Sequence, residues 1–270
     1  MFLLIDIGGT KTRIAVSKDK QTLEDIHIIE TPQDFEEAMV AIKTAVSEVT
    51  KGENIDTAAI AVPGVLNKEK AQLERSPNLI PWINHPLKQK LLEFIHAPLF
   101  IENDAQLGGL GEVWFGAGKG FDIVAFYTIS TGVGGARIVN GHIDKYSLGF
   151  EPGAQIIGFD EKPITLESRA GGRGLKELYH TKPEDINDPK VWAEVARDLA
   201  IGINNALVFW SPDVVILGGS VVQSIDLDLL RKNVKDFCII FPTIPPIKKA
   251  ALGDESGLYG ALAYLQSKTS

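Results

Sequence analysis

The segment Ile5-Asp6-Ile7-Gly8-Gly9-Thr10-Lys11-Thr12 decides the fold and points to the function. It continues an apolar run at residues 2–5, which predicts a buried strand, and precedes an alternating run at residues 13–16, which predicts a returning strand. Two glycines let the backbone turn sharply and approach a ligand closely. Backbone N–H groups freed in such a turn form an anion-binding concavity, so the segment indicates nucleotide phosphate binding. An ordinary hairpin with a Gly-Gly turn is the alternative.

Side chains of the same segment fit a phosphate site. Thr10 and Thr12 offer hydroxyl donors, and Lys11 offers a positive charge. Asp6 stands at the end of the predicted strand, where its carboxylate could hold a hydrated Mg²⁺. The alternative for Asp6 is a cap of the turn that follows the strand.

The composition is that of an ordinary globular protein, with 44% apolar and 23% charged residues. A length of 270 residues is natural for two domains. The net charge of −8 argues against nucleic-acid binding, which needs a basic face, and no apolar run is long enough to span a bilayer. The N-terminus lacks the basic region of a signal peptide, so we expect none there. The single cysteine, Cys238, excludes an intrachain disulfide. A cytoplasmic enzyme or binding protein fits these features.

Strand and helix patterns alternate along the chain, which predicts an α/β fold with a largely covered sheet. The predicted strands lie at 2–7, 12–17, 25–30, 58–62, 99–101, 123–129 and 213–217, and the predicted helices near 33–50, 85–94, 191–210, 226–235 and 256–267.

A second glycine-rich hairpin repeats the first. Ile5 aligns with Ile129, Gly8 with Gly132 and Arg13 with Arg137, all at one offset. Two domains of one fold, each offering a phosphate-binding hairpin, would explain this repeat. A nucleotide would then lie in the cleft between the domains, where ligand sites are frequent.

Eight short segments in a fixed order carry a family resemblance. They are residues 6–11, 62–64, 76–79, 102–105, 130–135, 151–153, 166–167 and 212–219. In this order they resemble the ROK family, and within it the sugar kinases, over nearly the whole chain. The resemblance implies two ribonuclease-H-like domains of the actin-like ATPase fold with an interdomain active-site cleft. We expect a smaller domain at 1–103, completed by a C-terminal helix at 251–270, and a larger one at 104–250.

The resemblance also implies an activity, namely ATP-dependent phosphorylation of a hexose at its terminal hydroxyl, with glucose as the default substrate. An N-acetylhexosamine or another sugar is an alternative substrate, and a non-catalytic sugar sensor on the same scaffold is an alternative function. ATP with Mg²⁺ and a small sugar are the expected ligands. The resemblance is also compatible with a homodimer, because dimers are common in the family. The first predicted strand begins at once, with no helix-turn-helix domain before it, so we expect no DNA binding.

Glu102-Asn103-Asp104 follows a predicted strand, so its side chains should emerge at a carboxyl end, where α/β sites occur. Asp104 matches the catalytic base of the family. A carboxylate within hydrogen-bond reach of the sugar hydroxyl can accept its proton. Asn103 matches a ligand of the sugar hydroxyls. The alternative is that Asp104 serves as the N-cap of a helix starting at Ala105.

Other positions match the sugar-binding and nucleotide-binding residues of the family. Glu151 and Glu167 match two glutamates that bind sugar hydroxyls, although Glu167 could instead be a surface residue of a short helix. Gly64 and Asn78 fit the sugar-side loops. The resemblance assigns the β- and γ-phosphates to Gly8, Gly9, Thr10, Lys11, Thr131, Gly132 and Gly134, the adenine and ribose to Gly218 and Gly219, and Mg²⁺ to Asp6 through water. A helix-entry turn is the alternative for the Gly218-Gly219 pair.

One departure concerns zinc. Most of the family has Glu-x-Gly-His followed by a cysteine-rich zinc segment, whereas Ala154 stands here after Gly153 and the cysteines are missing. We therefore expect no structural zinc. The missing imidazole leaves the identity of the sugar open, and Gln155 is a candidate polar contact in its place.

Overall fold

The chain forms two compact units in this computed structural model, which describes residues 1–269 and, apart from Asp25 and Thr269, their side chains. The first unit comprises residues 1–115 and the described residues from 254 onward, and the second comprises residues 116–253. Residues 104–115 therefore lie with the first unit, whereas the sequence led us to expect a boundary at 103. Their helix packs against the C-terminal helix, which belongs to the same unit.

The first unit is built on a five-stranded sheet with the order β3-β2-β1-β4-β7. Its strands are β1 (Phe2–Ile7), β2 (Lys11–Ser17), β3 (Glu24–Glu30), β4 (Thr57–Val62) and β7 (Leu99–Asn103), with a small pair formed by β5 (Val65–Leu66) and β6 (Leu73–Arg75). Its helices are α1 (Phe35–Thr50), α2 (Leu87–Leu92), α3 (Asp104–Trp114) and α8 (Ser256–Thr269), with the short turns η1 (Ile80–Trp82) and η5 (Gly253–Glu255).

The second unit has a five-stranded sheet with the order β10-β9-β8-β13-β14. Its strands are β8 (Ile123–Ile129), β9 (Val133–Val139), β10 (His142–Ile143), β13 (Val214–Gly218) and β14 (Ile247–Lys249), with a separate pair formed by β11 (Ile156–Asp160) and β12 (Lys162–Thr165). Its helices are α4 (Leu166–Ala170), α5 (Gly172–Tyr179), α6 (Pro189–Trp210) and α7 (Leu227–Phe237), with the short turns η2 (Pro152–Ala154), η3 (Pro183–Asp185) and η4 (Ser220–Ser224).

The two sheets repeat one topology, as the sequence predicted. In each, the first strand pairs antiparallel with the second and parallel with a strand that follows a crossover, β4 or β13. The single sequence offset does not hold across the hairpins, however. Asp6 pairs with Arg13 in the first hairpin, whereas Arg137 pairs with Ala125 in the second. The reason is that the second hairpin turns directly after Ile129, while the first strand continues past Ile5 to Ile7.

Each unit has its own hydrophobic cluster. Helix α1 illustrates how the sequence builds the first: Phe35, Met39 and Ile42 recur at helical spacing and all lie buried against the sheet. The carboxylate of Asp34 accepts a hydrogen bond from the Glu37 backbone N–H and caps this helix, so the helix begins at Phe35. In the second unit the single Cys238 is buried within the apolar cluster, as the sequence predicted.

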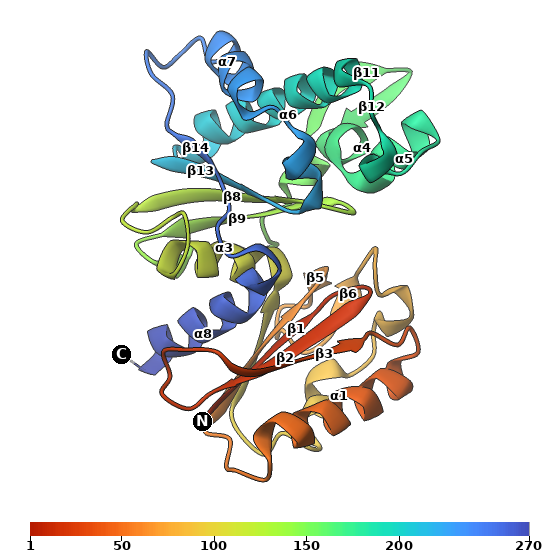
Figure 1. Cartoon of the computed structure of the whole chain (residues 1–270), viewed down its shortest axis with the longest axis vertical. Helices are drawn as coiled ribbons and strands as arrows, with labels where there is room; N and C mark the ends of the chain where they lie inside the picture. The colour runs from red at the N-terminus through yellow and green to blue at the C-terminus, as the bar shows by residue number, and fades with distance from the viewer. Residues whose placement is uncertain (270) are drawn as a thin grey trace. The chain divides into compact units, whose positions relative to one another are not determined.

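Helices α3 and α8 cross at very short range within the first unit (Figure 1). A Cβ atom added at Gly111 of α3 would lie 2.5 Å from the Ser256 carbonyl oxygen and 2.8 Å from the Gly260 nitrogen of α8. A Cβ atom added at Gly257 would lie 2.5 Å from Cγ of Asp6. Glycines therefore let α8 lie directly on α3 and on the end of β1.

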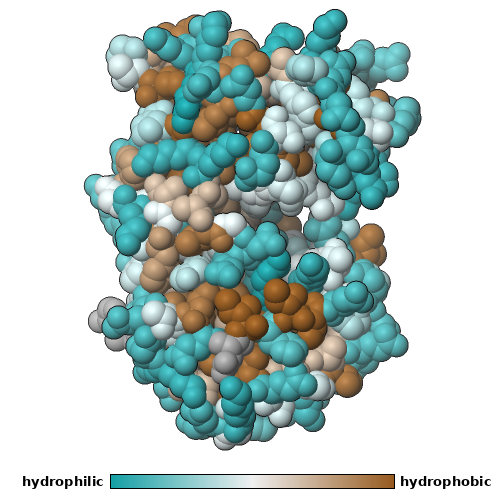
Figure 2. All heavy atoms as spheres, in the orientation of Figure 1, coloured by the Kyte–Doolittle hydropathy of each residue, from teal (hydrophilic) through white to brown (hydrophobic). Residues whose placement is uncertain are grey.

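The surface mixes polar and apolar side chains. On the face drawn in Figure 2, separate apolar patches interrupt a mainly hydrophilic surface. Large apolar side chains that are strongly exposed include Leu148, Phe209 and Ile239. Among the residues that the structure describes, no helix is both long enough and apolar enough to cross a bilayer.

Candidate active site

Three predicted residues of the first unit meet at one edge of its sheet. Strands β1, β4 and β7 run parallel, with Asp6 opposite Ala61, and Val62 opposite Asn103. The carboxyl ends of these strands therefore bring Asp6, Gly64 and Asn103 to the same edge. Open α/β sheets bind ligands outside the carboxyl ends of their strands, so the fold concentrates the predicted residues of this unit where such a site is expected.

Asp104 is the first residue of α3, directly after β7. Its Oδ1 accepts a hydrogen bond from the Ala105 backbone N–H at 2.8 Å, but the N-cap of the helix is Asn103, whose side chain accepts from the Gln106 N–H. The capping alternative therefore falls to Asn103. Desolvation by burial raises the pKa of the Asp104 carboxyl, and the hydrogen bond from Ala105 opposes that rise. A carboxyl tuned upward in this way is a better proton acceptor than a solvated one.

Asn103 uses both ends of its amide within the protein. Its Nδ2 donates to the Gly64 carbonyl oxygen at 3.1 Å, while its Oδ1 accepts from Gln106. Gly64 has a φ of +127°, and a Cβ atom there would clash with the backbone of Arg75 and Ser76. The amide of Asn103 retains a second N–H and a second lone pair for a ligand.

Asp6 is half-buried at the end of β1 and has a strongly perturbed pKa. Desolvation and the nearby charge of Asp104 raise its pKa from 3.8 to about 7, while Arg13 opposes the rise. Arg13 is itself paired with Asp254 at 2.6 Å. A buried carboxyl whose charge is further disfavoured by a neighbouring carboxyl is a place where a cation would be favoured, and oxygen donors suit Mg²⁺. The residues present therefore fit a magnesium ion near Asp6.

The first hairpin turn lies against the predicted sugar-side loop. The Gly8 N–H donates to the Lys11 carbonyl oxygen at 2.9 Å and closes the turn. A Cβ atom at Gly9 would lie 2.7 Å from Cβ of Asn78, so these two predicted residues are brought into contact. The side chains of Thr10 and Lys11 are exposed at the turn.

The loop that carries Gly64 and Asn78 is fastened to the sheet. Ser76 Oγ donates to the Pro63 carbonyl oxygen at 2.7 Å and accepts from the Leu79 N–H at 3.1 Å. In addition, Lys70 of this loop forms an ion pair with the buried carboxylate of Glu102, which immediately precedes Asn103. The sugar-side loop and the strand that ends at Asn103 are therefore held as one assembly.

In the second unit the structure brings Glu167 onto the second hairpin turn. Its Oε2 accepts a hydrogen bond from the Val133 N–H at 2.9 Å, and a Cβ atom at Gly132 would lie 2.5 Å from the same oxygen. The start of α5 completes the arrangement, because the Gly172 N–H donates to the Ser130 carbonyl oxygen and the Arg173 N–H donates to that of Thr131. Glu167 is half-buried and shares the turn at 131–134 with the predicted phosphate contacts.

Gly218 and Gly219 end the strand next to that turn. Gly218 is the last residue of β13 and pairs with Thr128 of the parallel strand β8. Both glycines therefore lie at the carboxyl end of β13. Gly219 has a φ of +92°, and a Cβ atom there would lie 2.5 Å from the carbonyl carbon of Ile129. The close approach of these backbones requires glycine at position 219.

Glu151 is exposed and stands immediately before η2, where the Ala154 N–H donates to its carbonyl oxygen at 3.1 Å. Gln155, at the other end of this turn, directs its side chain into the protein. Its Oε1 accepts from Nδ2 of Asn205 at 2.8 Å, and its Nε2 donates to the Pro152 carbonyl oxygen at 2.8 Å. Both ends of the amide are therefore already hydrogen-bonded within the unit.

Sequence reasoning missed three features of this region. The Lys70–Glu102 pair and the role of Gly257 both depend on contacts between segments far apart in sequence. Gln106 is buried, and its Oε1 has no hydrogen-bond partner among the residues that the structure describes. The one available signal was a polar residue one helical turn beyond Asn103, on a helix whose other residues, apart from Asp104 and Glu112, are apolar or glycine.

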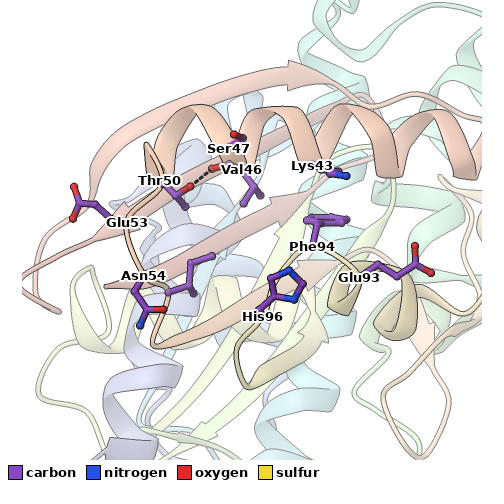
Figure 3. A pocket seen from close by; sticks show the side chains of 11 residues that line it. Lys43, Val46, Ser47, Thr50, Glu53, Asn54, Glu93, Phe94 and His96 are labelled. Atoms are coloured by element: carbon purple, nitrogen blue, oxygen red, sulfur yellow. Dashed lines mark hydrogen bonds between the residues drawn. The ribbon is translucent and has the colours of Figure 1, made fainter.

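A separate hollow lies elsewhere in the first unit (Figure 3). It has a volume of about 450 Å³ and lies between the second half of α1 and the segments that lead into β4 and β7, where Phe94 and His96 face it. Ile55 precedes β4 and His96 precedes β7, so the hollow lies at the amino ends of these strands. Asp6 and Asn103 stand at the opposite ends, and no predicted site residue lines the hollow.

These observations define a class of protein. Two α/β units with the same sheet topology each place a glycine-rich hairpin turn at the carboxyl ends of parallel strands, and this is the two-domain actin-like ATPase fold. The family model of ROK matches residues 2–268, so the chain belongs to the ROK family.

Known proteins resemble the chain over its whole length. A crystal structure of a ROK hexokinase from Thermus thermophilus has a TM-score of 0.87 and 26% identity, covering 100% of this chain and 99% of that chain. A ROK family glucokinase from Streptomyces griseus in complex with glucose and AMPPNP has a TM-score of 0.81 and 26% identity, covering 97% and 98%. An N-acetyl-D-glucosamine kinase from Haemophilus influenzae is 28% identical over 307 residues, covering 99% of this chain and 100% of the relative.

Proposed function

We propose that this ROK-family chain is a sugar kinase that transfers the γ-phosphoryl group of ATP to the terminal hydroxyl of a hexose, with glucose as the first candidate. The main support for this proposal is the position of Asp104. Its partly buried carboxyl has a raised pKa and lies beside Asn103, at the carboxyl ends of the parallel strands. Family membership over residues 2–268 and the glucokinase relative bound to glucose and AMPPNP support the assignment.

Asp104 is the proposed base. Its carboxylate accepts the proton of the sugar hydroxyl as the hydroxyl oxygen attacks the γ-phosphorus, and the bond between that phosphorus and the bridging oxygen breaks to release ADP. The transition state of phosphoryl transfer is loose, so the main tasks of the protein are to position the groups and to stabilise charge. Burial suits Asp104 to this task because it brings the pKa of the carboxyl closer to neutral pH.

Sugar hydroxyls are assigned to Asn103, Glu151 and Glu167, with Gly64 and Asn78 in the supporting loop. Carboxylate oxygens accept hydrogen bonds from neighbouring hydroxyls, which suits a diol. Phosphate oxygens are assigned to the turn at Gly8–Lys11 and to Thr131, Gly132 and Gly134, and the adenosine to Gly218 and Gly219. Backbone N–H groups in such turns bind anions without a cationic side chain.

Asp6 is proposed to hold Mg²⁺ through a water molecule. No cluster of three or more carboxylate, histidine or cysteine side chains that could hold a metal occurs in the part of the chain that the structure describes. Mg²⁺ bound through one carboxylate, waters and the phosphates of the nucleotide needs no such cluster. When bound, the ion neutralises charge on the β- and γ-phosphates.

An N-acetylhexosamine is the second candidate substrate, because an N-acetyl-D-glucosamine kinase is among the relatives and Ala154 stands where most of the family has histidine. The deciding experiment is an ADP-release assay with glucose, mannose, N-acetylglucosamine and N-acetylmannosamine, with Mg²⁺ and ATP. We expect turnover with at least one of them and the highest kcat/KM with glucose. A folded protein that binds sugar without turning it over would instead be a sensor, and one that neither binds nor turns over any sugar would contradict the proposal.

A further inference from the structure

We infer that Gln155, held in place by Asn205, is the positioning residue for the two proposed sugar-binding glutamates, Glu151 and Glu167. This inference rests on the proposed function. Gln155 lies between the two glutamates in the chain and connects directly to the segment that carries each of them.

The connection to Glu151 runs through η2. Gln155 Nε2 donates to the carbonyl oxygen of Pro152 at 2.8 Å, and Pro152 is the residue that follows Glu151. The short turn is further closed by the hydrogen bond from the Ala154 N–H to the Glu151 carbonyl oxygen. The Gln155 side chain thus fixes the backbone from which the carboxylate of Glu151 projects.

The connection to Glu167 runs through the backbone. The carbonyl oxygen of Gln155 accepts from the Leu166 N–H at 3.0 Å, at the first residue of α4. Glu167 is the next residue, and its carboxylate in turn holds the Val133 N–H of the hairpin turn. A displacement of Gln155 would therefore pass to Glu167 and from it to the turn.

The anchor of this arrangement is α6. Asn205 of α6 donates to Oε1 of Gln155 at 2.8 Å, and α6 is a 22-residue helix with a long buried face. Helix α6 also lies very close to Leu166 and Gln155, since a Cβ atom added at Gly202 would lie 2.6 Å from Cδ2 of Leu166 and 3.2 Å from Nε2 of Gln155. A rigid helix thus sets the place of a flexible side chain. Preorganisation of this kind makes binding stronger, because less conformational freedom is lost when the ligand binds.

The test uses two variants that both break the hydrogen bond between Gln155 and Asn205, and one matched control. Of the two, Gln155→Ala also removes the hydrogen bond to Pro152. Asn205→Asp keeps the size of the side chain but replaces the N–H donor with an acceptor, so it faces the Gln155 oxygen with another oxygen. Gln155→Ala removes the connection from the other side. Asn204→Asp makes the same chemical change one residue earlier on α6 and serves as the control.

We expect Asn205→Asp and Gln155→Ala to raise the KM for sugar by about tenfold or more, because small misplacements of binding groups are costly. The KM for ATP should rise less than the KM for sugar, because it is affected only through Glu167 and the turn, and kcat should stay within about twofold of wild type; a general loss of structure would not give this split. The double variant should be no worse than Gln155→Ala alone, since that substitution already removes the hydrogen bond to Asn205. Asn204→Asp should behave like wild type.

Two further measurements keep the test decisive. Asn205→His can place a ring Nδ1–H donor near the position of the asparagine Nδ2 and should recover part of the sugar affinity that Asn205→Asp loses. Amide hydrogen exchange at Val133 needs no ligand: it should be faster in Gln155→Ala and Asn205→Asp and unchanged in Asn204→Asp, because Glu167 holds that N–H. The exchange result tests the inference even if the wild-type protein proves not to be a kinase. Folded variants with wild-type sugar KM and unchanged exchange at Val133 would overturn it.

Discussion

The crossing of α3 and α8 should set both the stability of the first unit and the geometry of its carboxylates, and Gly111→Ala tests this. In an open helix, replacing glycine by alanine stabilises by about 1 kcal/mol. At position 111 the new Cβ atom would lie 2.5 Å from the Ser256 carbonyl oxygen and 2.8 Å from the Gly260 nitrogen. Both contacts are with backbone atoms, so no side chain can rotate away.

Relief of these contacts requires α8 to move away from α3 by roughly 1 Å. Overpacking of this kind costs about 3 kcal/mol at the upper end, and the gain in helix propensity offsets about 1 kcal/mol of it. The net loss of about 2 kcal/mol corresponds to a fall in Tm of about 4–8 °C for a protein of this size. Because the first turn of α8 also carries Gly257 against Asp6, we expect kcat to fall by about 10- to 100-fold.

The assay combines thermal unfolding with steady-state kinetics on the sugar that wild type turns over best. Gly158→Ala is the control, because a Cβ atom there would be in ordinary contact, 3.8 Å from Cδ1 of Ile164. It should leave Tm and kcat close to wild type. A Gly111→Ala protein with a raised Tm would show that helix propensity outweighs packing at this crossing and would contradict the prediction.

Three further predictions concern the carboxyl groups. Burial raises the pKa of Asp104, so kcat/KM should fall as the pH is lowered through that pKa, and a pH–rate profile should place this limb above the ordinary range of an aspartate. The pKa of Asp6 is raised from 3.8 to about 7 in the folded state, so ionisation of Asp6 destabilises the native protein over this pH range. Asp6→Asn should therefore be more stable than wild type by a free-energy difference that grows as the pH rises from about 4 to about 7 and then levels off. Unfolding at several pH values measures this difference, and a constant difference would contradict the prediction. Glu167→Ala should raise the KM for both sugar and ATP, because it removes the hydrogen bond to the Val133 N–H. Glu167→Gln can still accept that hydrogen bond, so it should raise mainly the KM for sugar. Equal effects of the two variants on the KM for ATP would contradict the role of the hydrogen bond.

Local patterns in the sequence were enough to predict the strands and helices that position the site. The apolar run before Asp6 and the helical spacing of Phe35, Met39 and Ile42 each predict an element that the structure contains. The repeated hairpin predicted two units of one topology. These features follow from short-range periodicity, which a single sequence displays directly.

Contacts between distant segments could not be predicted in the same way. The single offset between the two hairpins was wrong because the register of each hairpin depends on where its first strand ends. The domain boundary lies after residue 115 rather than 103 because α3 packs on α8. That contact depends on glycines whose role the local sequence does not reveal. The hydrogen bond between Asn205 and Gln155 joins residues 50 positions apart and carries no local signal. The roles of Asp104, Glu151 and Glu167 stay predictions that kinetics must test.

The most direct test of the central claim is phosphoryl transfer by Asp104→Asn, measured with radiolabelled ATP and the best sugar, together with calorimetric sugar binding by the same preparation. Asparagine keeps the shape of the side chain but cannot accept the hydroxyl proton. We expect a loss of kcat of about 10²- to 10⁴-fold, with sugar affinity changed by no more than a few-fold. A variant that binds sugar and retains wild-type kcat would contradict it.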